Sequence, residues 1–130
     1  VGDKAVYNGT VWEKWDVQDE KQRFTSSAQT ITPSGSLTLA HGLGAAPFWV
    51  GAYLECATAE LGYAIGDKVY IGFMDVGVES QNNTGLSVFV NDATNIKVRY
   101  GSAIAIAHGG TGATAGITLG SWRLRIIAEL

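Results

Sequence analysis

The chain has 130 residues, a net charge of -3 and a pI near 5.2. This length fits one domain, and the acidic balance excludes nucleic acid as an expected partner, because binding to phosphate backbones needs a basic surface. The single cysteine, Cys56, excludes an intrachain disulfide and a zinc site of the C-x-x-C type. No apolar stretch approaches the roughly 20 residues of a membrane helix, so we expect no membrane insertion, and nothing indicates a metal or cofactor.

Charged residues make up 16% of the chain. About a quarter is usual for a soluble domain. The low share indicates that another chain covers part of the uncharged surface. The first residue is Val1 rather than methionine, which suggests a piece of a longer protein.

The N-terminal stretch GDKAVYNGTVWEKWD has Asn8-Gly9 between two alternating runs. Asn-Gly is the preferred two-residue hairpin turn, because both central residues take positive φ. Residues 17–23, VQDEKQR, are polar and highly charged, which is typical of a connector. We therefore predict an N-terminal hairpin and connector over residues 1–22, as the remnant of a shaft, and a second unit over residues 23–130.

From Leu37 onward, short runs with strand-like alternation are separated by turns. The runs are SLTLAHGL, PFWVGAYLECA, DKVYIGFMDV, GLSVFVN, NIKVRYGSAIAIA and SWRLRIIAEL. Six or seven short strands predict an all-β fold, and we expect an antiparallel, jelly-roll-like β-sandwich, with a barrel as the other possibility. The only helix candidate is LECATAELGYAIG, residues 54–66.

A glycine-rich stretch, residues 110–115, has the G-x-G-x-x-A form of a dinucleotide-binding fingerprint. Such a loop ends a strand and starts a helix, and an acidic residue follows about 20 positions later. Here ITLGSWRLRIIAEL follows Gly116, alternates as a strand and then the chain stops. We therefore interpret the stretch as a flexible connection between strands.

Three short stretches indicate a family. GGTGATAG resembles a motif that recurs in bacteriophage tail fibres, and GDKAVYNGTVWEKWD resembles the hairpins where fibre modules join. LTLAHGLGAAPFWVGAYLEC is similar to an H-G-L-G-x-x-P-x-x-V pattern in β-sandwich modules of phage tail and virion proteins. The resemblance implies a homotrimeric distal appendage that contacts the bacterial surface, usually its glycans.

Alternation predicts a core-facing set on one strand: Phe48, Val50, Ala52, Leu54 and Cys56. If the next strand is its neighbour, Trp49, Tyr53 and Tyr70 gather around Gly51 and Gly72 on the outer face. Flat aromatic rings pack against the apolar face of a sugar, but they are also enriched at subunit interfaces. The low charged fraction favours the interface, and ordinary core packing or solvent exposure is a third possibility.

Two polar loops are candidate sites for sugar hydroxyls. Asn82 and Asn83 lie in the loop of residues 79–85, and Asn91 and Asp92 lie in the loop of residues 91–95. The alternative, which we favour, is that these residues form ordinary turns, because Asn and Asp bond their own backbone.

Two pairs of basic residues alternate with apolar ones: Lys97 with Arg99, and Arg123 with Arg125. If the two strands are adjacent, the pairs form a basic stripe, and Arg99 and Arg123 are the candidates to bind an acidic glycan. A solvated face, or pairing with acidic residues across strands or subunits, is the favoured alternative. The candidate acidic partners are Glu55, Glu79 and Glu129.

Catalytic motifs are absent from the sequence. His41 and His108 each lie beside glycine, where a histidine can hydrogen-bond a turn. There is no G-x-S-x-G elbow, no H-E-x-x-H pair and no calcium-loop spacing. We predict that the protein is not an enzyme, although a glycosidase site assembled from distant strands remains an alternative.

These observations and the resemblance together predict a tail-fibre or virion-appendage tip. We expect a homotrimer on the virion that binds lipopolysaccharide or capsule without covalent chemistry and contacts other virion proteins. The alternative is a structural trimerisation or capping module that binds no receptor. A glycan-degrading tail enzyme is the third candidate.

Overall fold

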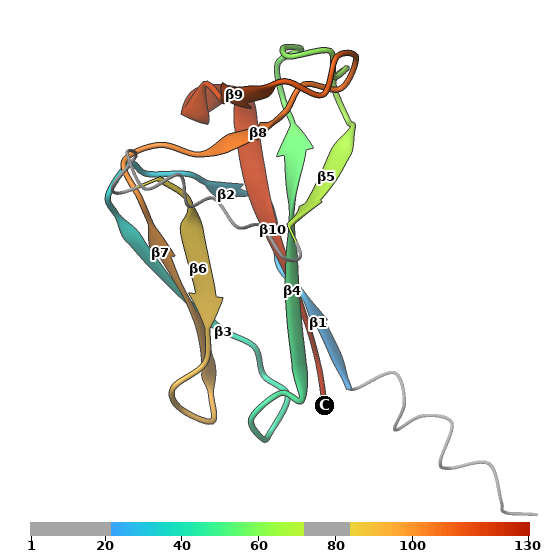
Figure 1. Cartoon of the computed structure of the whole chain (residues 1–130). Helices are drawn as coiled ribbons and strands as arrows, with labels where there is room; N and C mark the ends of the chain where they lie inside the picture. Colours follow the sequence, from blue (N-terminus) through green and yellow to red (C-terminus); the bar gives the residue numbers. More distant parts are fainter. Residues whose placement is uncertain (1–21, 72–83) are drawn as a thin grey trace, which may run out of the picture.

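The computed structural model describes residues 22–71 and 84–130. Within these residues the protein is an all-β, antiparallel sandwich of two facing sheets (Figure 1). The predicted fold class is therefore confirmed. The predicted N-terminal hairpin and connector lie outside the described residues, apart from their last residue, Gln22. The candidate loop residues Asn82 and Asn83 also lie outside them.

The first sheet has the order β1-β10-β4-β5, and β2 pairs with the other half of β10. Its strands are β1 (Arg23–Thr25), β2 (Gln29–Thr30), β4 (Trp49–Cys56), β5 (Lys68–Ile71) and β10 (Trp122–Glu129). β4 and β10 pair over all eight residues of each strand, from Trp122↔Cys56 to Glu129↔Trp49. This long central pair sets the register of the outer face on which the aromatic residues lie.

The second sheet has the order β3-β7-β6. Its strands are β3 (Ser36–Ala40), β6 (Leu86–Phe89) and β7 (Asn95–Tyr100). β7 is the central strand, and it runs towards the end of the sandwich opposite to the C-terminus (Figure 1).

Alternation decides which side chains form the core between the sheets. Along β10, every second side chain is buried, beginning at Trp122, and along β7 the same holds from Ile96. The fully buried side chains of the largest volume are Trp122, Leu54, Ile96, Ile104, Leu124, Ile126, Val98 and Cys56. Burial of each large aliphatic side chain contributes about 1.5–3 kcal/mol, so this layer is the main stabilising feature.

A small hairpin closes one end of the sandwich (Figure 1). It consists of β8 (Ala105–Ala107) and β9 (Thr114–Gly116), and a 3-10 turn, η1 (Leu119–Ser121), leads from it into β10. The fingerprint-like stretch is the turn of this hairpin, where the His108 N–H donates to Ala113 O at 2.8 Å. A turn between antiparallel strands is not the strand-to-helix junction of a dinucleotide site, which confirms its interpretation as a connection.

The only helix candidate, residues 54–66, is not helical. β4 continues to Cys56, and the following residues form a turn that returns to β5, with Cys56 N–H donating to Asp67 O and Gly66 N–H to Cys56 O. Leu61 has φ 54°, followed by Gly62 at 81°. Positive φ at successive residues is incompatible with a right-handed helix, so the alanine and glutamate content was misleading here.

Two further predictions need correction. Phe48 does not face the core: it precedes β4, and its side chain is 89% exposed. The Phe48 N–H donates to Glu129 O, so this residue lies where the pairing of β4 with β10 ends. The run NIKVRYGSAIAIA is two strands, because the chain leaves the second sheet at Gly101 and β8 pairs with β9 instead.

Candidate functional site

An aromatic platform, consisting of Trp49, Gly51, Tyr53 and Tyr70, lies on the outer face of the first sheet. The register places Tyr53 of β4 opposite Tyr70 of β5, and their ring centroids are 5.3 Å apart at an interplanar angle of 48°. Trp49 and Gly51 precede Tyr53 at intervals of two on β4, so they share its face. The structure thus brings the three predicted aromatic residues onto one surface.

Gly51 is the residue that lets Trp49 lie against the sheet. A Cβ atom at Gly51 would come within 2.5 Å of Cη2 and 2.7 Å of Cζ2 of the indole ring. The benzo edge of the indole therefore occupies the space over Gly51 that a side chain would fill, and 48% of Trp49 is exposed. A flat, half-exposed indole is the type of surface on which an apolar ligand face can stack.

The two tyrosine rings of the platform differ in exposure. Tyr70 is 68% exposed, whereas Tyr53 is only 8% exposed although it points away from the core. Its neighbours explain this difference: Tyr70 packs beside it, and the Lys68 Nζ atom lies 5.3 Å from the Tyr53 ring centroid. Trp49 and Tyr70 are therefore the accessible rings of the platform, and Tyr53 packs against Tyr70.

Charged side chains border the platform. Arg125, opposite Tyr53 in the register, donates from Nε to Glu55 Oε1 at 2.7 Å. The hydrogen bond to Glu55 raises the pKa of Arg125 above its usual value. At the Trp49 end, Arg23 pairs with Glu129. The predicted pairing of Arg125 with Glu55 is therefore present, and each of these two ion pairs is neutral as a whole.

Arg123 lies on the same outer face but is held by the backbone. Its Nη1 donates to Gly120 O at 2.9 Å and to Trp122 O at 2.8 Å. In the register it is opposite Glu55, two residues beyond Arg125. These bonds orient the guanidinium towards the η1 turn rather than towards the platform.

The predicted basic stripe does not form. Lys97 and Arg99 belong to β7 in the second sheet, whereas Arg123 and Arg125 belong to β10 in the first sheet. All four alternate with buried residues, so the two pairs point outward on opposite sides of the sandwich. Alternation identified the faces correctly, but it does not specify which strands are neighbours.

Asp92 forms a turn, as the favoured interpretation proposed. Its carboxylate accepts the N–H groups of Thr94 at 2.9 Å and Asn95 at 2.8 Å, and it pairs with Lys97 Nζ at 3.4 Å. The hydrogen bonds from the backbone of Thr94 and Asn95 hold the pKa of Asp92 well below its usual range. Asn91 is exposed beside it, on the hairpin that joins β6 to β7 and away from the platform.

The two histidines also have the predicted role. Nδ1 of His41 accepts the Leu43 N–H at 3.0 Å, and Nδ1 of His108 accepts the Gly110 N–H at 2.9 Å. Both imidazoles therefore stabilise the backbone of glycine-containing loops.

The carboxylates of the described residues all have partners. Glu55, Asp92 and Glu129 form ion pairs, Glu60 accepts bonds from Thr118 and Trp122, and Asp67 accepts the Ala64 N–H. Across residues 22–71 and 84–130, no cluster of three or more potential metal ligands occurs. None of the helices in the same residues is long and apolar enough to cross a membrane.

Two features of the outer faces of the sheets were not predicted from the sequence. Lys68 lies over the Tyr53 ring, and alternation with Tyr70 is the signal that could have suggested it. A groove beside Arg99 forms where the turn around Ser34 meets the start of β6. No sequence signal could have revealed this meeting, because the two segments are about 50 positions apart.

Comparison with known proteins finds no relative of the chain. No protein family, curated protein or solved structure matches the chain significantly. The geometry of the platform and the short fibre-like stretches of the sequence are therefore the basis for a function.

Proposed function

We propose that the protein is the tip of a bacteriophage tail fibre or similar virion appendage, which attaches to a bacterial surface glycan as a homotrimer. The observation that supports glycan binding best is the platform, where the half-exposed Trp49 lies over Gly51 on the same sheet face as the exposed Tyr70. The fibre-like stretches support the phage setting. Neither covalent chemistry nor a cofactor is needed for this function.

The platform suits a sugar ring because it combines apolar faces with polar edges. The C–H face of a pyranose would stack on the Trp49 indole or the Tyr70 ring, and the Lys68 ammonium beside Tyr53 can donate to hydroxyls. Contacts of this size are individually weak. Three copies on one rigid head would bind cooperatively through effective concentration, which is how a fibre tip gains avidity.

Retention on bacteria tests the proposal. Fluorescently labelled full chain is incubated with a panel of bacteria, and the retained fraction is compared for the wild type, Trp49→Ala and Phe48→Ala. Phe48 is the matched control, because it adjoins Trp49, is even more exposed and precedes the strand that carries the platform. We expect Trp49→Ala to abolish retention and Phe48→Ala to leave it unchanged, whereas equal retention of all three proteins would contradict the proposal.

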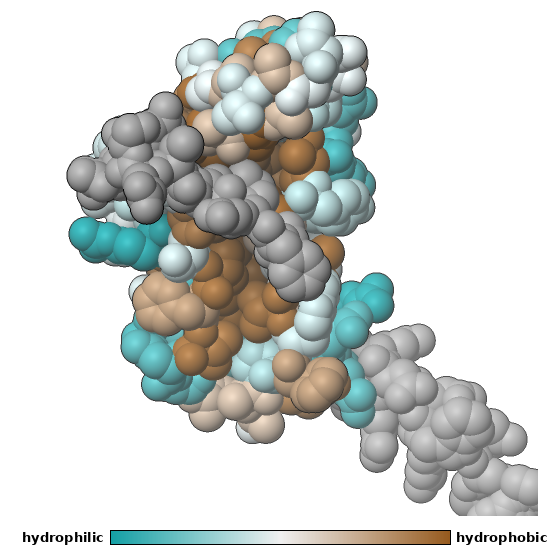
Figure 2. All heavy atoms as spheres, viewed as in Figure 1, coloured by the Kyte–Doolittle hydropathy of each residue, from teal (hydrophilic) through white to brown (hydrophobic). Residues whose placement is uncertain are grey.

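The structural alternative is a trimerisation or capping module that binds no receptor. Two observations favour it. Leu130 N–H donates to Gln22 O, and Trp49 pairs with the adjacent Glu129, so Trp49 lies at the end of the sandwich where the chain enters from residue 22. Apolar residues also gather between the two sheets on the side shown in Figure 2, with hydrophilic residues towards both outer sides. For such a module, Trp49→Ala would disrupt the oligomer.

The third candidate, a glycan-degrading enzyme, would need two carboxylates about 5–10 Å apart in a cleft, one of them free to donate a proton. In the described residues every carboxylate already accepts hydrogen bonds or pairs with a cation. This favours binding over hydrolysis. Following the size of the polysaccharide during the same incubation distinguishes the two, since only an enzyme shortens it.

A further inference from the structure

Arg99 is the one basic side chain without a partner in the part of the chain that the structure describes. Four of the six basic residues there are engaged by acidic or aromatic side chains, namely Arg23, Lys68, Lys97 and Arg125. The guanidinium of Arg123 donates to two backbone carbonyls. Arg99 is exposed, and its nearest basic neighbour on β7, Lys97, already has Asp92 as its counter-ion. Its charge is therefore available to a ligand.

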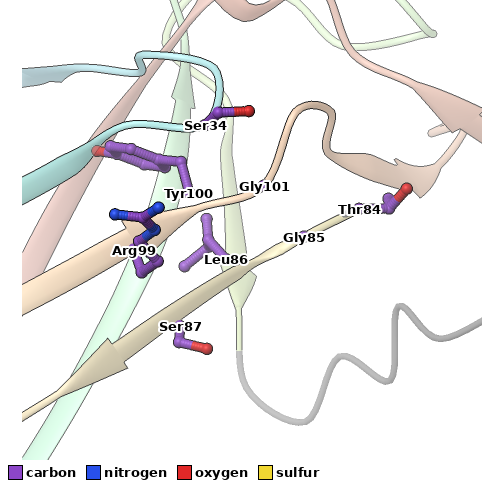
Figure 3. Close-up of a pocket in the computed structure, with 8 residues that line it drawn as sticks. All are labelled: Ser34, Thr84, Gly85, Leu86, Ser87, Arg99, Tyr100 and Gly101. Atoms are coloured by element: carbon purple, nitrogen blue, oxygen red, sulfur yellow. The ribbon is translucent and has the colours of Figure 1, made fainter. Parts of the chain in front are cut away.

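Arg99 lines a groove of about 370 Å³ on the second sheet (Figure 3). Ser34 lies on the turn before β3, Arg99 on β7, and Thr84 and Ser87 on the segment that leads into and forms β6. Besides Tyr100, whose hydroxyl is buried, three lining residues carry a hydroxyl and one carries a guanidinium, and none of the described lining residues is acidic. Hydroxyl and guanidinium groups can all donate hydrogen bonds to an oxyanion.

Backbone hydrogen bonds connect the segments that carry these groups. Ser34 N–H donates to Gly101 O at 2.9 Å, and Gly101 N–H donates to Gly85 O at 2.7 Å. These bonds tie the turn, the end of β7 and the start of β6 together. In the register, Ser87 lies directly opposite Arg99, so the two residues carry their side chains on the same face of the second sheet. A site whose donors are already positioned loses less entropy on binding.

We propose that this groove binds an oxyanion substituent of a glycan, either the carboxylate of a uronic acid or a phosphate. The planar guanidinium fork matches both groups, and the hydroxyls can bond the remaining oxygens and the sugar. This inference rests on the proposed function for its glycan, but it concerns a different sheet from the platform. Arg99 lies near the end of β7, which runs towards the end of the sandwich opposite to the C-terminus and therefore away from the entry at Gln22 (Figure 1).

Equilibrium binding of defined oligosaccharides tests the inference. The full chain is titrated against labelled trigalacturonate, its methyl ester and a mannose oligosaccharide with a 6-phosphate. We expect at least one anionic probe to bind and the ester to bind about tenfold more weakly or worse, because esterification removes the charge and leaves the sugar. The two anionic probes distinguish the carboxylate from the phosphate.

Variants locate the binding. Arg99→Gln should weaken the anionic probe about tenfold or more, Arg99→Lys should weaken it less, and Arg123→Gln, the matched control on the opposite sheet, should change it less than about twofold. Thermal unfolding of each variant verifies that it is folded. Equal affinity for acid and ester, no binding of either anionic probe, or wild-type affinity in Arg99→Gln would overturn the inference.

The experiments can contradict either proposal and leave the other intact. If Trp49→Ala loses retention on bacteria but keeps the affinity for the anionic probe, both sites stand as distinct surfaces. If the protein is not retained on bacteria while the probe still binds through Arg99, the proposed attachment function is contradicted and the anion site is supported. If the protein is retained on bacteria but Arg99→Gln leaves probe binding unchanged, only the proposed anion site is contradicted.

Discussion

At the scale of single residues, the platform depends on a glycine as much as on its aromatic rings. Trp49 can lie across the sheet only because position 51 has no side chain. The alternation of the sequence predicted which rings share a face. It did not predict that Tyr53 would be buried by its neighbours, because that depends on where Tyr70 and Lys68 pack.

Gly51→Ala tests this dependence. The new methyl group would displace the Trp49 ring, so we expect glycan binding to fall about tenfold while the fold remains intact, with the Trp49 indole N–H resonance shifted. The control is Gly120→Ala, because a Cβ there meets open space. An unshifted indole resonance together with unchanged binding would disprove the role assigned to Gly51.

Tyr100→Phe and Tyr63→Phe should change stability in opposite directions. The Tyr100 hydroxyl is buried without a hydrogen-bond partner in the described part of the chain, whereas the Tyr63 hydroxyl donates to Ala107 O at 2.8 Å. Removing an unsatisfied buried hydroxyl should stabilise the protein by about 1 kcal/mol, and removing the satisfied one should destabilise it by about 0.5–1.5 kcal/mol. Urea unfolding measures both, and destabilisation by Tyr100→Phe would show that its hydroxyl has a partner.

At the scale of elements, the sequence predicted the strands but not all of their partners. Alternation identified the strands around residues 36–40, 49–56 and 122–129, since a half-buried strand shows a period of two. It could not place β7 and β10 in different sheets, because pairing depends on contacts between distant segments. The helix candidate of residues 54–66 is not helical for a related reason, because the pairing of β4 with β5 overrides local propensity.

The turn between β4 and β5 is anchored by Glu60. Its Oε2 accepts the Thr118 N–H at 2.7 Å and the Trp122 Nε1–H at 2.8 Å, which ties the turn to the start of β10. Partial burial raises the pKa of Glu60, but the hydrogen bonds from Thr118 and Trp122 lower it more, so the net value is below the usual 4.5.

Glu60→Gln should therefore destabilise the protein in a pH-dependent way. A carboxyl whose pKa is lower in the folded state contributes stability above its unfolded pKa and loses this contribution as the pH falls through the folded value. We expect the wild type to exceed the variant by on the order of 1 kcal/mol or less at neutral pH, with the difference shrinking below pH 4.5. Urea unfolding across this pH range would contradict the assignment if the two stability curves run parallel.

At the scale of the whole molecule, the sandwich presents two dissimilar outer faces. The first sheet bears the aromatic platform with paired charges around it, and the second sheet bears the Arg99 groove. Such a division suits a head that combines apolar stacking with recognition of an acidic substituent. It also means that a trimer contact covering one face would leave the other accessible.

The oligomeric state is the first test at this scale. We expect light scattering at micromolar concentration to give a mass near three times the 13.7 kDa of one chain. The reasons are the low charged fraction and the exposed apolar side chains, of which Ile65 is 71% exposed. A clean monomer would contradict the homotrimer.

The proposed function is the binding of a bacterial surface glycan by the platform. The most direct measurement is the equilibrium dissociation constant for polysaccharide extracted from a strain that retains the protein, compared between the wild type and Trp49→Ala at equal oligomeric mass. We expect the variant to bind at least about tenfold more weakly, because a stacked tryptophan contributes a large share of such binding. An unchanged constant would contradict it, and loss of the oligomer in Trp49→Ala would assign the platform to the subunit interface instead.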